Sequence, residues 1–158
     1  KEEEVMVEME QEGEYAADFL EELLDIADID GDLDIGVSNE RPLVSITSEL
    51  ASSNLKLLSD PETVVALQEI TRLAVQVKTT ELSRVILDIS GSRKKREEEL
   101  EFLVEKTLQK IEETGKDQHL EPMTSYERKI VHDLVAEAGY VSESEGQGRD
   151  RHIVVKNS

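Results

Sequence analysis

The chain contains no cysteine and no tryptophan, and aromatic residues make up only 3% of its 158 residues. The absence of cysteine excludes a disulfide framework and a thiolate metal site, and it suits the reducing cytoplasm. No apolar run approaches the roughly 18 residues that a membrane-spanning helix needs, and no basic segment followed by an apolar run marks a signal peptide. We therefore expect a cytoplasmic protein without membrane insertion, whose core is built from aliphatic side chains.

Basic residues are also scarce. Their 18 positive charges stand against 37 acidic residues, which gives a net charge of −19 and argues at first against a nucleic-acid partner. The imbalance is local, however. Residues 1–40 hold 16 acidic residues and one basic residue, whereas residues 92–158 hold 15 acidic and 12 basic residues. Because charges are screened over about 8 Å, a basic patch in the second half could still bind a polyanion, weakly and with strong salt dependence.

Motifs that carry catalysis or hold metal ions are missing. The sequence has no P-loop, no nucleophile elbow and no dinucleotide-binding glycine pattern. The aspartates within residues 28–34 suggest a calcium loop, but the glycine and glutamate that such a loop needs at its sixth and twelfth positions are absent. His119, His132 and His152 are far apart in sequence and lack metal-ligand spacing. We expect no enzymatic activity, no cofactor and no metal site.

One helix in the second half carries a distinctive pair of residues. Thr124 and Glu127 form the sequence signature of a capping box, so the helix is predicted to begin there. Its apolar positions recur at helical spacing: Tyr126, Ile130, Val131, Leu134, Val135 and Ala138. Arg128 and His132, four residues apart, fall at the edge of this stripe. Two such donors are well placed to hold a phosphate, although the same spacing also occurs on ordinary solvated helix edges.

The text around this pair resembles a known family. Arg128 and His132, with three residues between them, match the R-three-H domain, which is associated with binding of single-stranded nucleic acid. The flanking segments LEPMTSYERK and SESEG, followed by RHIVV, resemble the bacterial Jag (SpoIIIJ-associated) proteins. After the helix we expect a polar loop over residues 142–150 and a strand over residues 152–156. The resemblance implies an RNA-binding domain over residues 92–158.

The first half is predicted to form a small α+β unit over residues 14–91. Residues 1–13 are acidic and of low complexity, and we expect them to be disordered. The pattern then predicts a helix from Tyr15, strands over residues 33–37 and 43–47 that form a hairpin, a short helix over residues 49–57, a helix from Pro61, and a strand over residues 85–89. The inward side of the helix from Pro61 is predicted to carry Val64, Leu67, Ile70, Ala74 and Val77.

This order of helix, strand, strand, helix, helix and strand resembles a type II KH domain, and the segments LASSNLKLLSDPETVVALQEITRLAVQV and SRVILDISG resemble the KH domain of Jag proteins. The match departs at the loop with which a KH domain holds nucleic acid, where two glycines are needed. Leu58 and Pro61 occupy the two glycine positions, and Asp60 between them would repel a phosphate. The alternative is that this segment only begins a helix, so no KH binding residues are assigned.

A cationic segment joins the two halves. Arg93, Lys94, Lys95 and Arg96 open a helix predicted to reach Thr114. Cations at a helix N-terminus oppose the helix dipole, which hints at a functional role. The alternative is a solvated face on which these cations pair with acidic residues four positions later.

Taken together, these patterns predict an α+β RNA-binding protein with a KH-like unit followed by an R-three-H unit. The predicted nucleic-acid contacts are Arg128 and His132, supported by Lys129, Arg149, Arg151 and the 93–96 cations. The resemblance implies a post-transcriptional or cell-envelope and elongation regulator that acts on single-stranded RNA, or single-stranded DNA, with a small KH-domain partner protein. The alternative is a protein-interaction scaffold whose KH-like unit has lost RNA binding.

Overall fold

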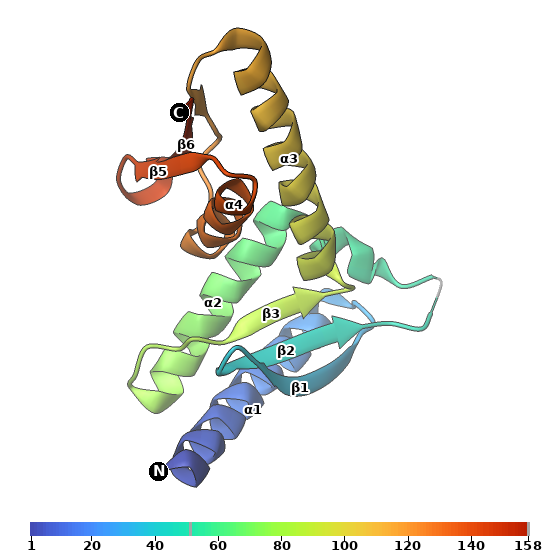
Figure 1. Cartoon of the computed structure of the whole chain (residues 1–158). Helices are drawn as coiled ribbons and strands as arrows, with labels where there is room; N and C mark the ends of the chain where they lie inside the picture. The colour runs from blue at the N-terminus through green and yellow to red at the C-terminus, as the bar shows by residue number, and fades with distance from the viewer. Residues whose placement is uncertain (51, 158) are drawn as a thin grey trace. The chain divides into compact units, whose positions relative to one another are not determined.

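The computed structural model describes residues 1–50 and 52–157, which form two compact units divided between Arg93 and Lys94. This division falls two residues after the boundary predicted from the sequence. Both units are mixtures of helices and small sheets, so the predicted α+β class is confirmed (Figure 1). No helix within the described residues is long and apolar enough to cross a membrane.

The first unit contains the elements α1 (Glu2–Ala27), β1 (Asp32–Ser38), β2 (Arg41–Thr47), the 3₁₀ helix η1 (Asn54–Leu58), α2 (Pro61–Thr79) and β3 (Ile86–Ile89). This order fits the KH-like prediction, except that the described part of the short helix expected over residues 49–57 contains only a 3₁₀ turn; residue 51 lies outside the described residues. The β1–β2 hairpin is antiparallel, and β3 lies beside β2 in parallel. A crossover containing η1 and α2 is therefore needed to return the chain for β3.

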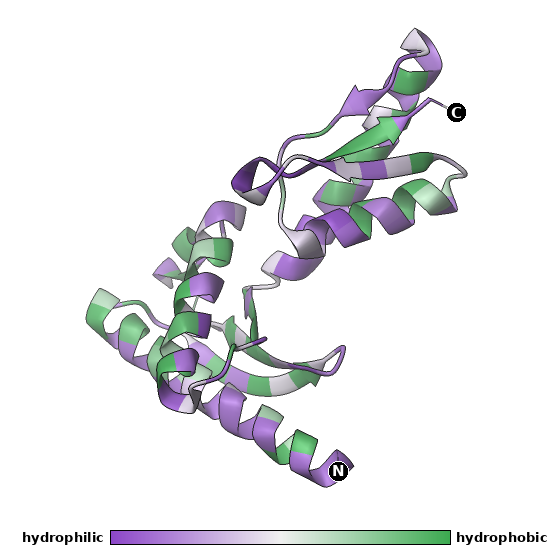
Figure 2. Ribbon diagram, turned by 90° about the vertical axis from the view of Figure 1, so that its left-hand side faces the viewer, coloured by the Kyte–Doolittle hydropathy of each residue, from purple (hydrophilic) through white to green (hydrophobic). Residues whose placement is uncertain are grey.

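The core of the first unit lies between the sheet and the helices α1 and α2. Apolar residues alternate along β2, so that Val44 and Ile46 are buried while Ser45 between them is only partly covered. They pack with Leu20 of α1, Val75 of α2 and other buried aliphatic residues. The helices in Figure 2 accordingly alternate between purple and green stretches, as amphipathic helices do.

The prediction that residues 1–13 are disordered is wrong, because α1 begins at Glu2. The last residues of this segment are held by the rest of the unit. Glu12 accepts hydrogen bonds from the Ser83 hydroxyl at 2.5 Å and the Arg84 backbone N–H at 2.7 Å, and Gly13 is buried. The acidic residues Glu2 to Glu4 also suit the positive end of the helix dipole.

The predicted inward face of α2 is wrong in its C-terminal half. Thr71 and Val75 are the buried residues of this helix, and Val64 and Leu67 pack partly against the core. Ile70 is 48% exposed and Val77 is 80% exposed. At about 100° per residue, these two side chains point roughly 140° and 160° away from the face centred on Val75. An apolar stripe therefore remains on the surface of α2.

The second unit contains most of α3 (Ser92–Thr114), followed by β4 (Gln118–His119), α4 (Ser125–Glu137), β5 (Val141–Glu145), the 3₁₀ helix η2 (Gly148–Asp150) and β6 (His152–Lys156). The strands form an antiparallel sheet with β6 in the centre, between β4 and β5. One face of β6 presents Ile153 and Val155 to a core that includes Leu100 of α3 and Val131 and Val135 of α4.

Two features of the second unit differ from the sequence prediction. The segment expected to be a polar loop over residues 142–150 contains the strand β5 and the 3₁₀ helix η2, and the two-residue strand β4 was not predicted. The sequence Val141 to Glu145 has too few apolar residues to indicate a strand. Its two serines are half-buried and its other side chains are exposed. The burial therefore alternates along the strand, but polar side chains occupy the half-buried positions.

Candidate nucleic-acid interface

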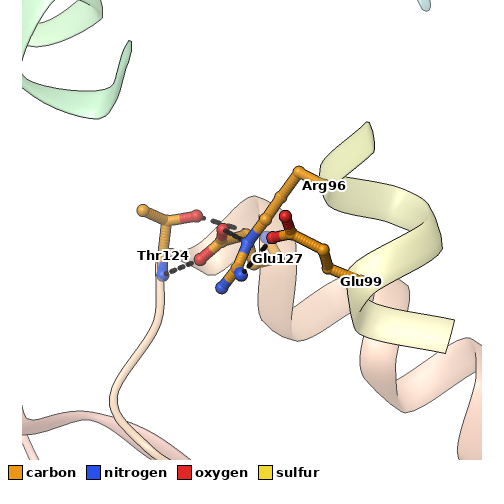
Figure 3. Close-up of polar contacts among 4 residues, drawn as sticks. All are labelled: Arg96, Glu99, Thr124 and Glu127. Carbon is orange, nitrogen blue, oxygen red and sulfur yellow. Dashed lines mark hydrogen bonds and ion pairs between the residues drawn. The ribbon is translucent and has the colours of Figure 1, made fainter. Parts of the chain in front are cut away.

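The N-terminus of α4 is fixed by the predicted capping box. The Thr124 side chain accepts a hydrogen bond from the Glu127 backbone N–H at 3.3 Å, and the Glu127 carboxylate accepts one from the Thr124 backbone N–H at 3.2 Å (Figure 3). These bonds satisfy backbone N–H groups that the helix itself leaves without partners. The capping box sets where α4 begins, and so it sets the positions of Arg128 and His132 one and two turns later.

Glu127 also bonds to an arginine that the sequence predicted to contact nucleic acid. Its side chain is only 11% exposed, and its Oε1 accepts a hydrogen bond from Arg96 Nε at 2.7 Å. Arg96 Nη1 bonds to Glu99 at 3.1 Å (Figure 3). Burial lowers the pKa of Arg96, but the bonds and charges of Glu127 and Glu99 outweigh it and raise the pKa. Arg96 therefore neutralises a buried carboxylate that belongs to the helix cap.

Arg128 and His132 lie at the edge of the buried face of α4, as predicted. Both are half-buried and flank the fully buried Val131. Arg128 donates a hydrogen bond from Nη1 to the backbone carbonyl of Met123 at 2.8 Å. A guanidinium has five N–H donors, so this bond fixes the direction of the side chain and uses only part of its capacity.

The imidazole of His132 lies between two hydroxyls of β5. Its Nδ1 is 2.7 Å from Ser142 Oγ and its Nε2 is 2.8 Å from Ser144 Oγ. In the neutral ring one nitrogen donates and the other accepts. The serine that accepts from the ring keeps its own O–H, which is able to donate to another group. His132 thus positions two hydroxyls, which lie on the same face of β5 because Ser142 and Ser144 are two residues apart.

The turn between β5 and β6 brings two further predicted residues to this region. Arg151 donates a hydrogen bond from Nη1 to the Gly146 carbonyl at 2.9 Å, and the Met123 backbone N–H bonds to the Arg151 carbonyl at 3.4 Å. The backbone of Met123 therefore bonds to the guanidinium of Arg128 and to the backbone carbonyl of Arg151. Arg149 lies in η2 and is exposed. The backbone of Arg151 thus lies beside the Met123 segment, while the guanidinium groups of Arg128 and Arg151 bond to different carbonyls, those of Met123 and Gly146.

The remaining predicted residues are placed differently. Lys129 is exposed on α4, and Lys94 and Lys95 are exposed on α3. Within the described residues neither Lys94 nor Lys95 forms an ion pair, whereas Arg96 pairs with Glu99 of α3 and with Glu127 of α4. Arg93 belongs to the first unit, where its backbone N–H bonds to Asp88 at 3.0 Å.

The segment that replaces the KH glycine loop forms the start of α2. Asp60 is the N-cap residue and Pro61 is the first helical residue, although the Asp60 side chain makes no capping bond. Pro61 has no N–H to offer a ligand, and Leu58 packs partly against the core. This local geometry agrees with the alternative that the segment serves to begin a helix.

Sequence reasoning missed the partners of these side chains. The contact between Arg96 and Glu127 spans 31 positions, and that between His132 and Ser144 spans 12, so no local periodicity could reveal them. It also treated the histidines as unrelated. His119 and His152 lie side by side on the sheet, with ring nitrogens 3.3 Å apart. The one sequence feature that pointed toward this pairing was the predicted strand over residues 152–156, which places His152 in a sheet.

Comparison with known proteins identifies the domain in the second half of the chain. Residues 98–157 match the R-three-H domain family. The chain is 34% identical over 136 residues to RNA-binding protein KhpB of Bacillus subtilis (strain 168), which covers 82% of this chain and 64% of that protein. It is 27% identical over 141 residues to RNA-binding protein KhpB of Clostridium symbiosum, covering 89% of this chain and 64% of that protein.

The chain carries an R-three-H domain and is similar over most of its length to RNA-binding proteins named KhpB. A third relative, RNA-binding protein KhpB of Lactiplantibacillus plantarum, is 28% identical over 127 residues, with 80% of this chain and 38% of that protein covered. The chain thus spans less than two thirds of the length of these relatives. The R-three-H domain contains α4, its Arg128 and His132, and the whole three-stranded sheet.

Proposed function

We propose that the R-three-H domain of this chain binds single-stranded RNA through phosphate contacts centred on Arg128 and Arg151. The observation that carries the proposal is the arrangement around Met123, whose carbonyl accepts a hydrogen bond from the Arg128 guanidinium and whose N–H bonds to the Arg151 backbone carbonyl. One turn after Arg128, His132 holds two hydroxyls of β5. The relatives' shared name, RNA-binding protein, supports RNA as the ligand. Single-stranded DNA is the competing nucleic acid.

The chemistry of the site suits phosphates better than bases. Arg128 and Arg151 each spend one N–H on a backbone carbonyl, and their remaining donors suit the paired oxygens of a phosphate. Lys129 and Arg149 add exposed charge. A serine hydroxyl ordered by His132 adds a neutral donor. Phosphate contacts of this kind give affinity and little choice of sequence.

The lysines at the start of α3 have a secondary role in this proposal. Lys94 and Lys95 are exposed and without ion pairs among the described residues, so they are available to a phosphate backbone. Arg96 is assigned to the helix cap instead, because it bonds to the buried Glu127. The start of α2 is assigned no RNA contact, since it offers a proline and an aspartate where a KH loop offers two glycines.

The resemblance to Jag proteins supports a wider proposal. The chain would act in the bacterial cytoplasm as a post-transcriptional or cell-envelope and elongation regulator, without catalysing a reaction. A small KH-domain protein would be its partner. Crosslinking RNA to the protein in cells and sequencing the bound RNA tests the regulatory proposal, because a regulator should retain a limited set of transcripts.

The decisive experiment for RNA binding replaces Arg128 with alanine in the whole chain. Fluorescence anisotropy with a short labelled single-stranded RNA should show weaker binding for several unrelated sequences. The slope of log affinity against log salt should become shallower by about 0.7, the share of one phosphate in a single strand. Lys110→Ala, at an exposed position of α3, is the matched control and should leave affinity and slope nearly unchanged.

A second outcome would favour a structural role for Arg128. If Arg128→Ala lowers the melting temperature while the folded protein keeps its affinity and salt slope, the arginine only braces the Met123 loop. Binding measured on protein shown to be folded by circular dichroism separates the two results, and equal binding of wild type and variant would sink the phosphate assignment.

The alternative function, a protein-interaction scaffold, is favoured by one observation. The exposed apolar stripe of α2 contains Ile70, Leu73 and Val77, which are 48%, 62% and 80% exposed. Large exposed apolar groups in line are typical of partner-binding surfaces. If wild-type protein fails to bind single-stranded RNA at low salt, while Leu73→Asp abolishes binding of the KH-domain partner, the scaffold function would replace RNA binding.

A further inference from the structure

We propose that the outer face of the sheet in the R-three-H domain carries a binding site for a borderline transition-metal ion such as Zn²⁺, formed by His119, Glu145 and His152. One ligand atom from each of these residues lies within 4.8 Å of the other two. His119 comes from β4, Glu145 from β5 and His152 from the central strand β6. The three side chains would therefore join all three strands of the sheet through one ion.

The strand register explains why the three residues meet. Glu145 is the direct antiparallel partner of His152, and His119 is the partner of Val154. Residues two apart on a strand share a face, so His152 and Val154 point to the same side, and His119 is the diagonal neighbour of His152. The opposite face of β6 carries Ile153 and Val155, which are buried in the core. The ligands thus occupy the face away from the core.

The spacing of the two imidazoles is compatible with a shared ion as well as with a direct hydrogen bond. His119 Nδ1 and His152 Nε2 are 3.3 Å apart, and the ring centroids are 5.5 Å apart. For comparison, N–H···O hydrogen bonds are commonest at about 2.9–3.0 Å. Two nitrogens bound to one tetrahedral zinc, each at about 2.05 Å, are separated by about 3.3 Å. The rings already stand at the ligand–ligand distance of such a site.

The second nitrogen of His152 has the partner that a metal ligand needs. His152 Nδ1 is 2.9 Å from the backbone carbonyl of Asp150. Because a carbonyl only accepts, Nδ1 carries the proton and Nε2 keeps its lone pair toward His119. An imidazole whose far N–H is held by a backbone carbonyl is the usual arrangement around protein-bound zinc.

The ligand set selects the class of ion. Two imidazoles and one carboxylate favour Zn²⁺, Ni²⁺ or Cu²⁺ over Mg²⁺ and Ca²⁺, which prefer all-oxygen shells. Glu145 also forms an ion pair with Lys156 at 3.7 Å, but Lys156 has two other carboxylates, Glu143 at 3.4 Å and Asp117 at 3.8 Å. Glu145 is therefore able to turn to the ion without leaving Lys156 unpaired.

The test is a calorimetric titration of the metal-free whole chain with Zn²⁺ at about pH 7.5, where unperturbed histidines are mostly neutral, with Ca²⁺ in excess to occupy the acidic surface. We expect one Zn²⁺ site per chain. The affinity for Zn²⁺ should be at least about tenfold lower in His152→Gln, and binding should be lost in the double variant His119→Gln with His152→Gln. Glu145→Gln should weaken it, whereas the matched variant Glu143→Gln, on the same face of the same strand, should retain it. Zn²⁺ should also raise the melting temperature of wild type and not that of the double variant.

A spectroscopic measurement on unmutated protein keeps the proposal testable if a variant fails to fold. Histidine ring signals in nuclear magnetic resonance spectra should shift with Zn²⁺ for His119 and His152 and stay in place for His132. Equal shifts of all three rings, or Zn²⁺ binding of the same strength in wild type and the double variant, would overturn the site.

Discussion

Arg96 and Arg128 show how differently two arginines of one domain are used. Arg96 bonds through two nitrogens to carboxylates, one of them that of the buried Glu127 in the α4 cap. Arg128 bonds through one nitrogen to a neutral carbonyl. A guanidinium that neutralises a buried acid stabilises the fold, whereas one that rests on a carbonyl keeps its charge for a ligand. The role of each arginine therefore depends on the group to which its guanidinium bonds.

We therefore predict opposite effects for two neighbouring cations. Arg96→Ala should lower the free energy of unfolding by about 2 kcal/mol, because it leaves the carboxylate of Glu127 without its charged partner. It should leave the RNA salt slope of the folded protein unchanged. Lys95→Ala should do the reverse, with normal stability and a slightly shallower slope. Urea unfolding and anisotropy titrations measure both quantities.

The pair Arg96 and Glu127 also provides a coupling test. In a double-mutant cycle with Glu127→Ala, the two losses should fall well short of adding, since either change breaks the same bond. Additive losses would show that Arg96 acts elsewhere, and would return it to the candidate RNA contacts.

At the scale of elements, α1 is the helix whose packing is least visible in the sequence. Gly13 sits in its interior, where glycine costs about 1 kcal/mol relative to alanine. The structure supplies the reason, because a Cβ at this position would lie 2.7 Å from Ile35 Cγ2 of β1. The close approach of α1 to the hairpin requires a residue without a side chain.

Gly13→Ala should accordingly destabilise the protein, even though alanine favours helix. Overpacking costs about 1–3 kcal/mol, and this exceeds the gain in helix propensity of about 1 kcal/mol, so we expect a lower melting temperature. Glu14→Ala, at the adjacent exposed position, is the control and should change stability little. A stabilised Gly13→Ala protein would show that α1 does not press against β1.

The elements also show how far the sequence determines the fold. The hairpin of β1 and β2, the strand β3 and the capping box of α4 follow from alternation and cap residues, which act over a few positions. The part of α1 around Glu12 and the strand β5 do not, because the contacts made there join distant residues: Glu12 with Ser83, and Ser142 with His132. Contacts between polar residues that are distant in sequence produce no regular spacing of apolar residues, so the sequence pattern does not reveal them.

The same limit applies to the candidate site. Arg128 and His132 were recognisable from their spacing and flanking text, because both lie on one helix. The link from Arg128 through Met123 to Arg151, and the cluster of His119 with His152, depend on strand register. Register becomes visible only when the strands are paired. The sequence therefore indicates the residues of one helix and misses the surfaces that several strands build.

At the scale of the whole molecule, the described residues form two hydrophobic cores that share no residue. Leu20 and Leu100 are matched probes of them, being 1% and 0% exposed. Each leucine-to-alanine change should cost roughly 3 kcal/mol in its own unit. Residue-resolved amide exchange should show faster exchange in the unit that carries the change and little effect in the other. Equal acceleration in both units would mean that the chain unfolds as one cooperative body.

The parallel pairing of β2 with β3 affects how the first unit forms during synthesis. Residues 48–85 lie between the two strands, and a ribosome working at about 5–20 residues per second takes roughly 2–8 s to make them. Throughout that interval β2 can pair with β1 but exposes its other edge, together with Val44 and Ile46, which later become buried. Exposed strand edges attract other chains. The nascent unit passes through a vulnerable period of seconds, which ends only when Ile86 to Ile89 arrive and complete the sheet.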